Sequence, residues 1–209
     1  MNIDKMNEGL NLLFPTPFYY GKTRKDNFDL IQSELDAAYE FLKPNFGIPE
    51  AWGHTHLLSD PTFKSCLFEN ENFKLPVMID EIAYQVYQYM TSMMFDKSAT
   101  FNGGSWKFQS SWFAQFDRGH YGHVHNHGSA DIAGVYYYKV DDSHPTFNIR
   151  CTNPSIEQSH ICHHLGYAID TAPEVGDFYL FPGFVPHAVK CNETDSTRIS
   201  VSFNINFLR

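Results

Sequence analysis

The fold class of this chain is indicated by a stretch that reads Trp106-Lys107-Phe108-Gln109-Ser110-Ser111-Trp112-Phe113-Ala114-Gln115-Phe116. Every second residue, counted from Trp106, is apolar or small, and most of the residues between are polar. Because side chains alternate between the two faces of a strand, the pattern predicts a long strand with one packed face and one more polar face.

Further short strands are predicted downstream, each separated from the next by turn-forming residues. Their ranges are 120–127, 132–140, 146–151, 165–170, 177–182, 186–191 and 197–207. About eight short strands with turns at this spacing are typical of a jelly roll or a related double sheet. We therefore expect a mainly β protein whose core is a cupin-like double-stranded β-helix.

Helical patterns precede these strands. Residues 28–43 repeat apolar side chains at helical spacing, with Asp26 or Asn27 as a possible N-cap. Residues 76–95 begin with a proline and carry a stripe of apolar and methionine side chains, which we interpret as core. Residues 12–20 contain two prolines and predict an edge strand, since each proline removes a hydrogen-bond donor.

The composition favours one soluble domain. At 209 residues the chain can form a single domain, 1–209, in which an N-terminal strand and supporting helices (1–104) flank a jelly-roll core (105–209). A net charge of -9 argues against nucleic acid or an anionic membrane as the main partner. No signal peptide, membrane span or CxxC pair is visible, so we expect a cytoplasmic protein with reduced thiols. The edge strand and amphipathic helices offer surfaces for a homodimer.

Four histidines lie within the eight residues 120–127. His123, His125 and His127 alternate, so in an extended strand all three imidazoles would project from one face. Imidazole is the commonest ligand of transition metals, and two alternate residues can bind one ion. The third ligand must come from elsewhere, and His187 follows a predicted buried strand and a tight turn. Both registers, His125 with His127 and His123 with His125, are open.

The last predicted strand places Arg198, Ser200 and Ser202 on one face. An arginine that faces into a barrel is costly unless an anion meets it. A carboxylate held in a bidentate fork, with a serine hydroxyl as a further donor, would satisfy it. The alternative is a structural ion pair with Asp177 or Glu174.

Four segments together resemble a known family. They are His125-Asn126-His127-Gly128-Ser129, Ala133-Gly134-Val135-Tyr136-Tyr137, the stretch from Gly176 to His187, and Arg198 to Asn204. In this order and spacing they resemble the 2-oxoglutarate- and Fe(II)-dependent oxygenases, in particular small members from marine bacteria and phages. The resemblance covers Ser105 to Phe207 well, matches the first strand near Pro15, and is loose in the helical region between them.

The resemblance implies a set of site residues. His125, His127 and His187 would bind Fe(II), and Arg198 with Ser200 would hold the far carboxylate of 2-oxoglutarate. His127 stands where the family commonly has an aspartate, which would leave the site one unit more positive. Asp131 or Asp117 could restore a carboxylate.

Other residues near these motifs have two interpretations. Gln115, Tyr136 and Tyr138 lie on strands expected to line the barrel, so they could contact cosubstrate or substrate, or else serve only as packing. His54 and His56 also alternate, but they lack strand-like surroundings and are expected outside the active site.

The function that the resemblance implies is a dioxygenase that decarboxylates 2-oxoglutarate and hydroxylates a small-molecule or peptidyl substrate. Two alternatives remain open. A cupin-type enzyme or zinc hydrolase could use three histidines without 2-oxoglutarate. A non-catalytic metal-binding module would explain the missing carboxylate most simply.

Overall fold

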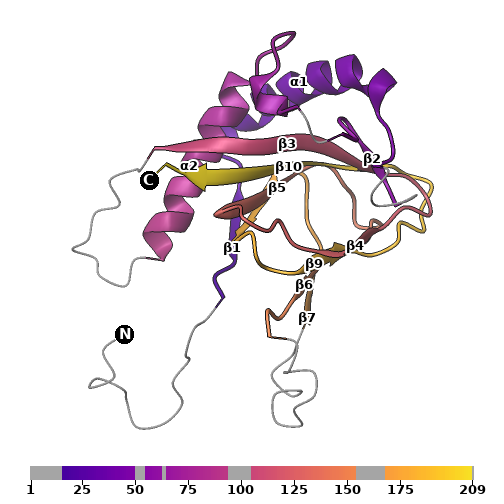
Figure 1. The fold of residues 1–209 in the computed structure, drawn as a ribbon. Coiled ribbons are helices and arrows are strands. Elements are labelled where there is room, and N and C mark those ends of the chain that lie inside the picture. The colour runs from indigo at the N-terminus through magenta and orange to yellow at the C-terminus, as the bar shows by residue number, and fades with distance from the viewer. Residues whose placement is uncertain (1–15, 50–54, 63–64, 94–104, 154–167, 209) are drawn as a thin grey trace, which may run out of the picture.

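The protein is described by a computed structural model that covers residues 16–49, 55–62, 65–93, 105–153 and 168–208. Two antiparallel sheets form its centre, and two helices lie against the outer face of the larger sheet (Figure 1). This is the double-sheet architecture that the strand pattern predicts. Among the described residues, no helix is long and apolar enough to span a membrane.

The helices occur where the sequence predicts them. Helix α1 spans Lys25–Leu42 and is followed by the short 3-10 turn Lys43–Asn45. Helix α2 spans Pro76–Ser92, and a second 3-10 turn, Leu67–Glu69, precedes it. The expected N-cap of α1 is wrong, because Arg24 occupies that position without a side-chain cap. The Asn27 side chain instead donates to buried Glu81 of α2 at 2.7 Å, which ties the two helices together. The predicted end of α2 at residues 94–95 lies outside the described residues.

The larger sheet has the strand order β1-β8-β5-β10-β3-β2. Its strands are β1 (Tyr19–Lys22), β8 (Asp177–Phe181), β5 (Ile132–Lys139), β10 (Arg198–Phe207), β3 (Trp106–Phe116) and β2 (Leu57–Leu58). Strand β1 lies at the edge, as the prolines predict, and residues 12–15 of the predicted strand lie outside the described residues. Strand β2 is not among the strands predicted from the sequence.

The smaller sheet has the order β4-β9-β6-β7. Its strands are β4 (Gly122–His125), β9 (His187–Val189), β6 (Phe147–Arg150) and β7 (Ala168–Thr171). Both faces of the larger sheet are buried, because one apolar cluster packs it against the helices and a second fills the space between the sheets. The predicted metal ligands, together with Arg198 and Ser200, face this second layer.

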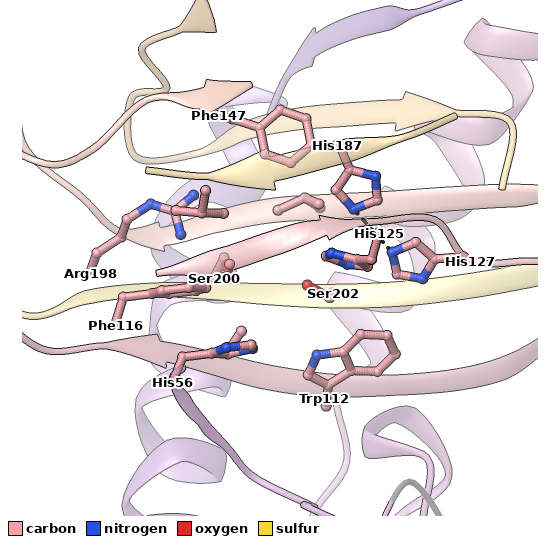
Figure 2. A pocket seen from close by; sticks show the side chains of 14 residues that line it. His56, Trp112, Phe116, His125, His127, Phe147, His187, Arg198, Ser200 and Ser202 are labelled. Carbon is pink, nitrogen blue, oxygen red and sulfur yellow. Dashed lines mark hydrogen bonds between the residues drawn. The ribbon is translucent and has the colours of Figure 1, made fainter. Parts of the chain in front are cut away.

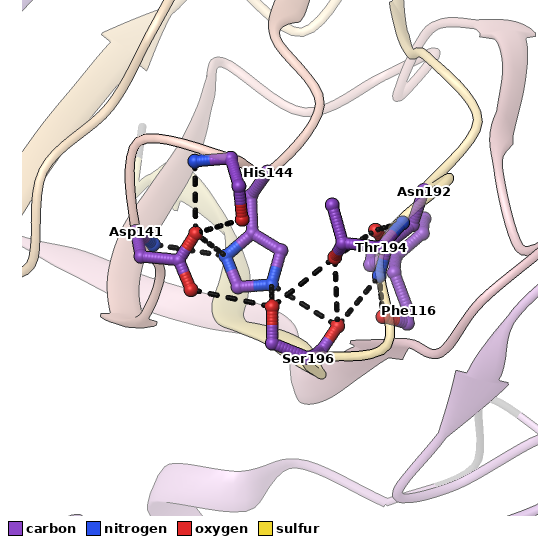
Figure 3. Close-up of polar contacts among 7 residues, drawn as sticks. Phe116, Asp141, His144, Asn192, Thr194 and Ser196 are labelled. Atoms are coloured by element: carbon purple, nitrogen blue, oxygen red, sulfur yellow. Dashed lines mark hydrogen bonds and ion pairs between the residues drawn. The ribbon is translucent and has the colours of Figure 1, made fainter.

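Two turns are clamped together at the start of β10 (Figure 3). His144 Nδ1 accepts a hydrogen bond from the backbone N–H of Asp141 at 2.9 Å, so its proton is on Nε2, which lies 3.0 Å from Ser196 Oγ. The three side chains resemble a Ser-His-Asp triad, but in this tautomer His144 donates to Ser196 and cannot take its proton. Buried Asn192 adds bonds from its side-chain amide to the carbonyls of Phe116 and Ser196, both at 2.9 Å. The clamp therefore fixes the chain just before Arg198.

Candidate metal and cosubstrate site

A cavity of about 40 Å³ lies between the two sheets (Figure 2). Its lining combines imidazoles, one guanidinium, hydroxyls and apolar side chains. These residues are His56, Trp112, Ala114, Phe116, Gly122, His125, His127, Val135, Phe147, His187, Val189, Arg198, Ser200 and Ser202. The alternation predicted for the last strand is confirmed, because Arg198, Ser200 and Ser202 all face this space.

Three histidines meet at one end of the cavity. Strand pairing sets His125 directly opposite His187, and the backbone N–H of His127 donates to Gly183 O at 2.7 Å in the turn before β9. One ring nitrogen from each histidine lies within 4.8 Å of the others. The Nε2 atoms of His127 and His187 are 3.2 Å apart. Such spacing suits three ligands of one metal ion.

Hydrogen bonds orient two of these rings. Nδ1 of His125 lies 2.7 Å from the His123 carbonyl oxygen, and Nδ1 of His187 lies 3.0 Å from that of Val185. A carbonyl can only accept, so in both rings Nδ1 carries the proton and Nε2 is the unprotonated ligand atom. His127 is held by its backbone bond and by stacking on Trp112, with ring centroids 5.9 Å apart.

Burial keeps the three imidazoles neutral. It lowers the pKa of His127 to about 3, lowers the pKa of His187 well below its usual value, and lowers the pKa of His125. Neutral imidazole is the form that binds a metal. The donor set therefore fits a transition metal such as Fe(II).

No carboxylate joins this group among the described residues. Asp117 accepts hydrogen bonds from Gln115 and Thr197, and Asp131 accepts one from the backbone N–H of Phe207. The proposed substitutes for the missing aspartate are therefore engaged elsewhere, and His123 also lies outside the group. Among the described residues, the candidate metal site therefore consists of three histidines.

Arg198 closes the other end of the cavity. It is 1 % exposed, and its Nε and one terminal nitrogen have no hydrogen-bond partner among the described residues. Its guanidinium carbon lies 4.9 Å from the Phe116 ring centroid and 5.2 Å from that of Tyr137. The alternative of an ion pair with Asp177 or Glu174 is wrong, because both carboxylates pair with Lys22.

Comparison with known proteins is consistent with this geometry. The sequence model of the family described as "Putative 2OG-Fe(II) oxygenase" matches residues 110–204. Over this segment, which is just under half of the chain, the sequence resembles the 2OG-Fe(II) oxygenases. No curated protein matches the sequence significantly. The predicted family resemblance is thus confirmed.

Solved structures share the 2OG-Fe(II) oxygenase fold at low sequence identity. A prolyl-4-hydroxylase from Pseudomonas putida is 13 % identical with a TM-score of 0.57, over 93 % of this chain and 94 % of that one. The alpha-ketoglutarate-dependent carbocyclase SnoK of nogalamycin biosynthesis is 10 % identical with a TM-score of 0.58, over 91 % and 79 %. HygX from Streptomyces hygroscopicus, solved with nickel, 2-oxoglutarate and hygromycin B, is 11 % identical with a TM-score of 0.55, over 91 % and 83 %.

Two residues considered for cosubstrate contact lie on the other face of the larger sheet. Gln115 accepts a hydrogen bond from the Tyr39 hydroxyl at 2.7 Å, and the hydroxyl of Tyr136 accepts one from Gln32 at 2.9 Å. Both therefore face α1, and the expectation that they could contact the cosubstrate is wrong. Tyr138, on the same face, bonds to Asp36 of α1.

His56 is the cavity residue that sequence reasoning placed outside the site. It precedes the two-residue strand β2, is 4 % exposed, and stacks on Phe116 with centroids 4.6 Å apart. Burial, with the nearby His125, lowers the pKa of His56 to about 3. The alternation of His54 and His56 was the available signal, and His54 lies outside the described residues.

Proposed function

We propose that this protein is an Fe(II)- and 2-oxoglutarate-dependent oxygenase that hydroxylates a small-molecule or peptidyl substrate. The family match and the oxygenase fold support the class. The observation that carries the proposal is Arg198, a buried cation in the same cavity as the histidine group. Two of the Arg198 nitrogens have no hydrogen-bond partner in the described part of the chain. Burying such a charge is costly unless an anionic ligand satisfies it.

The side chains divide the cavity into two functions. His125, His127 and His187 would hold Fe(II) through neutral imidazole nitrogens. Arg198 would bind the far carboxylate of 2-oxoglutarate, and Ser200 would add a hydroxyl donor from the same face of β10. Bound in this way, the cosubstrate would be held between Arg198 and the histidines.

Apolar side chains would exclude water from the reacting atoms. Val135, Phe147 and Val189 line the same cavity, and Phe147 contacts His187 with ring centroids 5.2 Å apart. When bound, Fe(II) and 2-oxoglutarate supply the oxidising chemistry, in which O2 and the oxo acid yield succinate, carbon dioxide and a hydroxylated C–H bond. The protein binds, orients and shields these reactants.

The test is an anaerobic titration. Fe(II) is added to metal-free protein, 2-oxoglutarate is titrated, and the visible charge-transfer band of the chelate is recorded. We expect a saturable band that His187→Ala abolishes and that Arg198→Met shifts to much higher 2-oxoglutarate concentration. Metal binding by the wild type without any band would overturn the proposal and favour a three-histidine protein that does not use 2-oxoglutarate.

A further inference from the structure

The charge of the loaded site is unbalanced, and this imbalance concerns the primary substrate. Fe(II) brings two positive charges and Arg198 one, whereas 2-oxoglutarate brings two negative charges. Three neutral imidazoles add none, so one positive charge remains uncompensated. A histidine pair with one carboxylate would cancel it. Between protein walls the effective dielectric is low, so such a charge attracts a counter-anion more strongly than it would in water.

The described part of the chain does not supply that counter-anion. No aspartate or glutamate lines the cavity within the described part of the chain. A second hollow of about 230 Å³ adjoins it and is lined by His56, His123, Val124 and His125, again with no acidic side chain among its described lining residues. His56 and His125 line both spaces, so the second hollow opens beside the histidine group.

His56 lies at this junction and packs against Phe116. Its ring is nearly parallel to that of Phe116, at 5°, and Figure 2 shows Phe116 between the guanidinium of Arg198 and the imidazole of His56. Its Nδ1 lies 3.0 Å from the buried hydroxyl of Thr55. The Thr55 hydroxyl and the Phe116 ring therefore fix the orientation of the His56 imidazole in the wall of the hollow.

The outer rim of the hollow is formed by β4. His123 and Val124 are exposed there, and His123 packs edge-on against Tyr121 with ring centroids 5.1 Å apart. The hollow therefore combines imidazoles with one apolar side chain. This composition suits the acid group of a small organic molecule better than a cationic group, which would meet the uncompensated positive charge.

We propose that the hollow formed by His56, His123, Val124 and His125 binds a carboxylate of the primary substrate, so that the substrate is an organic acid. The inference rests on the proposed function, because the charge count requires Fe(II) and 2-oxoglutarate. It names a substrate class for the same site. His56 and His123 are its specificity-determining residues.

The test compares two probes that differ in charge but hardly in shape, butyrate and butyramide. Each is titrated calorimetrically into the anaerobic complex of the protein with Fe(II) and 2-oxoglutarate, while the charge-transfer band is recorded on the same sample. We expect butyrate to bind at least about tenfold more tightly, with the band retained. His127→Asp adds the missing carboxylate and should abolish the preference while the band persists.

Two further variants locate the probe. His56→Gln and His123→Gln, the latter at an exposed position, should each weaken butyrate binding several-fold, whereas His120→Gln, which lines neither space, should not. Equal affinity for the two probes, with the band present, would overturn this inference alone. Loss of the band on addition of butyrate would show displacement of the cosubstrate and would also overturn it. Absence of the band from the start would overturn the proposed function and this inference with it.

Discussion

The Nε2 atoms of His127 and His187 face each other at 3.2 Å, although 60 residues separate them in the chain. His187 Nδ1 bonds to a backbone carbonyl, so its Nε2 presents a lone pair to its neighbour. His125 adds a third imidazole nitrogen within 4.8 Å. Lone pairs that converge in this way are best satisfied by a single cation.

Metal binding should therefore stabilise the protein. At a free Fe(II) concentration 100 times the Kd, linkage predicts about 2.7 kcal/mol of added stability, or a rise in Tm of roughly 5–10 °C for a chain of this size. Anaerobic differential scanning fluorimetry measures the shift. His187→Ala should lose it and His120→Gln should keep it. An equal shift in His187→Ala would show that the metal binds elsewhere.

The buried charge of Arg198 should lower the stability of the folded protein when no anionic ligand is bound to it. Arg198→Met keeps most of the volume and removes a buried, partly unpartnered charge. We expect the metal-free variant to be more stable by about 1–2 kcal/mol in urea denaturation. Its affinity for 2-oxoglutarate should fall by about 100-fold, because the bidentate charge pair is lost. If Arg198→Met is less stable than the wild type, the assignment of Arg198 as the binding site of an anionic ligand is contradicted.

The strands that carry the site were predictable because their side chains alternate cleanly. Trp112 and Phe116 alternate on β3, and Arg198 and Ser200 alternate on β10, so each pattern fixes both the strand and its buried face. His187 was found because a buried strand and a tight turn precede it. Both the alternation and the turn before His187 can be read from neighbouring residues. Burial of the strand faces makes the alternation stricter, because a shift by one residue would move every apolar side chain to the wrong face.

The errors arose where the signal was not local. Gln115 pairs with Ile199 and Tyr136 with Val201, so both follow the odd-numbered side of β10, opposite to Arg198. This assignment requires the strand register, which the sequence does not give. His56 was missed because β2 has two residues, too few to show alternation, and exists only through pairing with β3.

Gly183 should control the position of His127. A Cβ at residue 183 would lie 2.3 Å from the Ala130 carbonyl oxygen, a backbone atom that cannot move alone. The Gly183 carbonyl also accepts the hydrogen bond from His127 N–H. Gly183→Ala should therefore displace the turn that carries His127 and weaken Fe(II) binding by about tenfold or more, in line with losses of supporting contacts at metal sites. Competition with a colorimetric chelator measures this.

Gly134→Ala is the matched control. A Cβ there would lie 2.1 Å from the fully buried ring of Phe203, on the helix side of the sheet. Overpacking of this kind costs about 1–3 kcal/mol of stability. The metal affinity of the folded fraction should be unchanged. Equal effects of the two variants on metal affinity would indicate general loosening rather than displacement of His127.

Asn192 should stabilise the approach to Arg198. Its side chain bonds to two carbonyls and accepts hydrogen bonds from the backbone N–H and the hydroxyl of Thr194. Asn192→Ala leaves buried groups unpaired, which costs about 2–3 kcal/mol, and it should also weaken 2-oxoglutarate binding. Thr194→Ala removes one hydroxyl and should cost under about 1 kcal/mol. If both variants bind 2-oxoglutarate as the wild type does, the clamp does not position Arg198.

Asp60 should make stability depend on pH in the acid range. Partial burial raises its pKa, but hydrogen bonds from Thr62 and Ser65 outweigh this and lower the pKa of Asp60 to about 2. The unfolded pKa is about 3.9, so the ionised group contributes fully above about pH 4, and this contribution is lost as the pH falls toward 2.

Asp60→Asn should therefore cost about 1–2 kcal/mol at pH 6, and the difference from the wild type should narrow between about pH 4 and pH 3. Urea denaturation of both proteins across this range measures it. Asp60 follows the β2 segment that brings His56 to the cavity. Next to it, the Ser59 N–H donates a hydrogen bond to the Phe113 carbonyl oxygen of β3, and the Ser59 hydroxyl accepts one from the Phe113 N–H. A stability difference between the two proteins that stays constant from pH 6 to pH 3 would contradict this prediction. It would show that the hydrogen bonds from Thr62 and Ser65 do not depend on the charge of Asp60, because an ionised carboxylate loses its stabilising contribution once it is protonated.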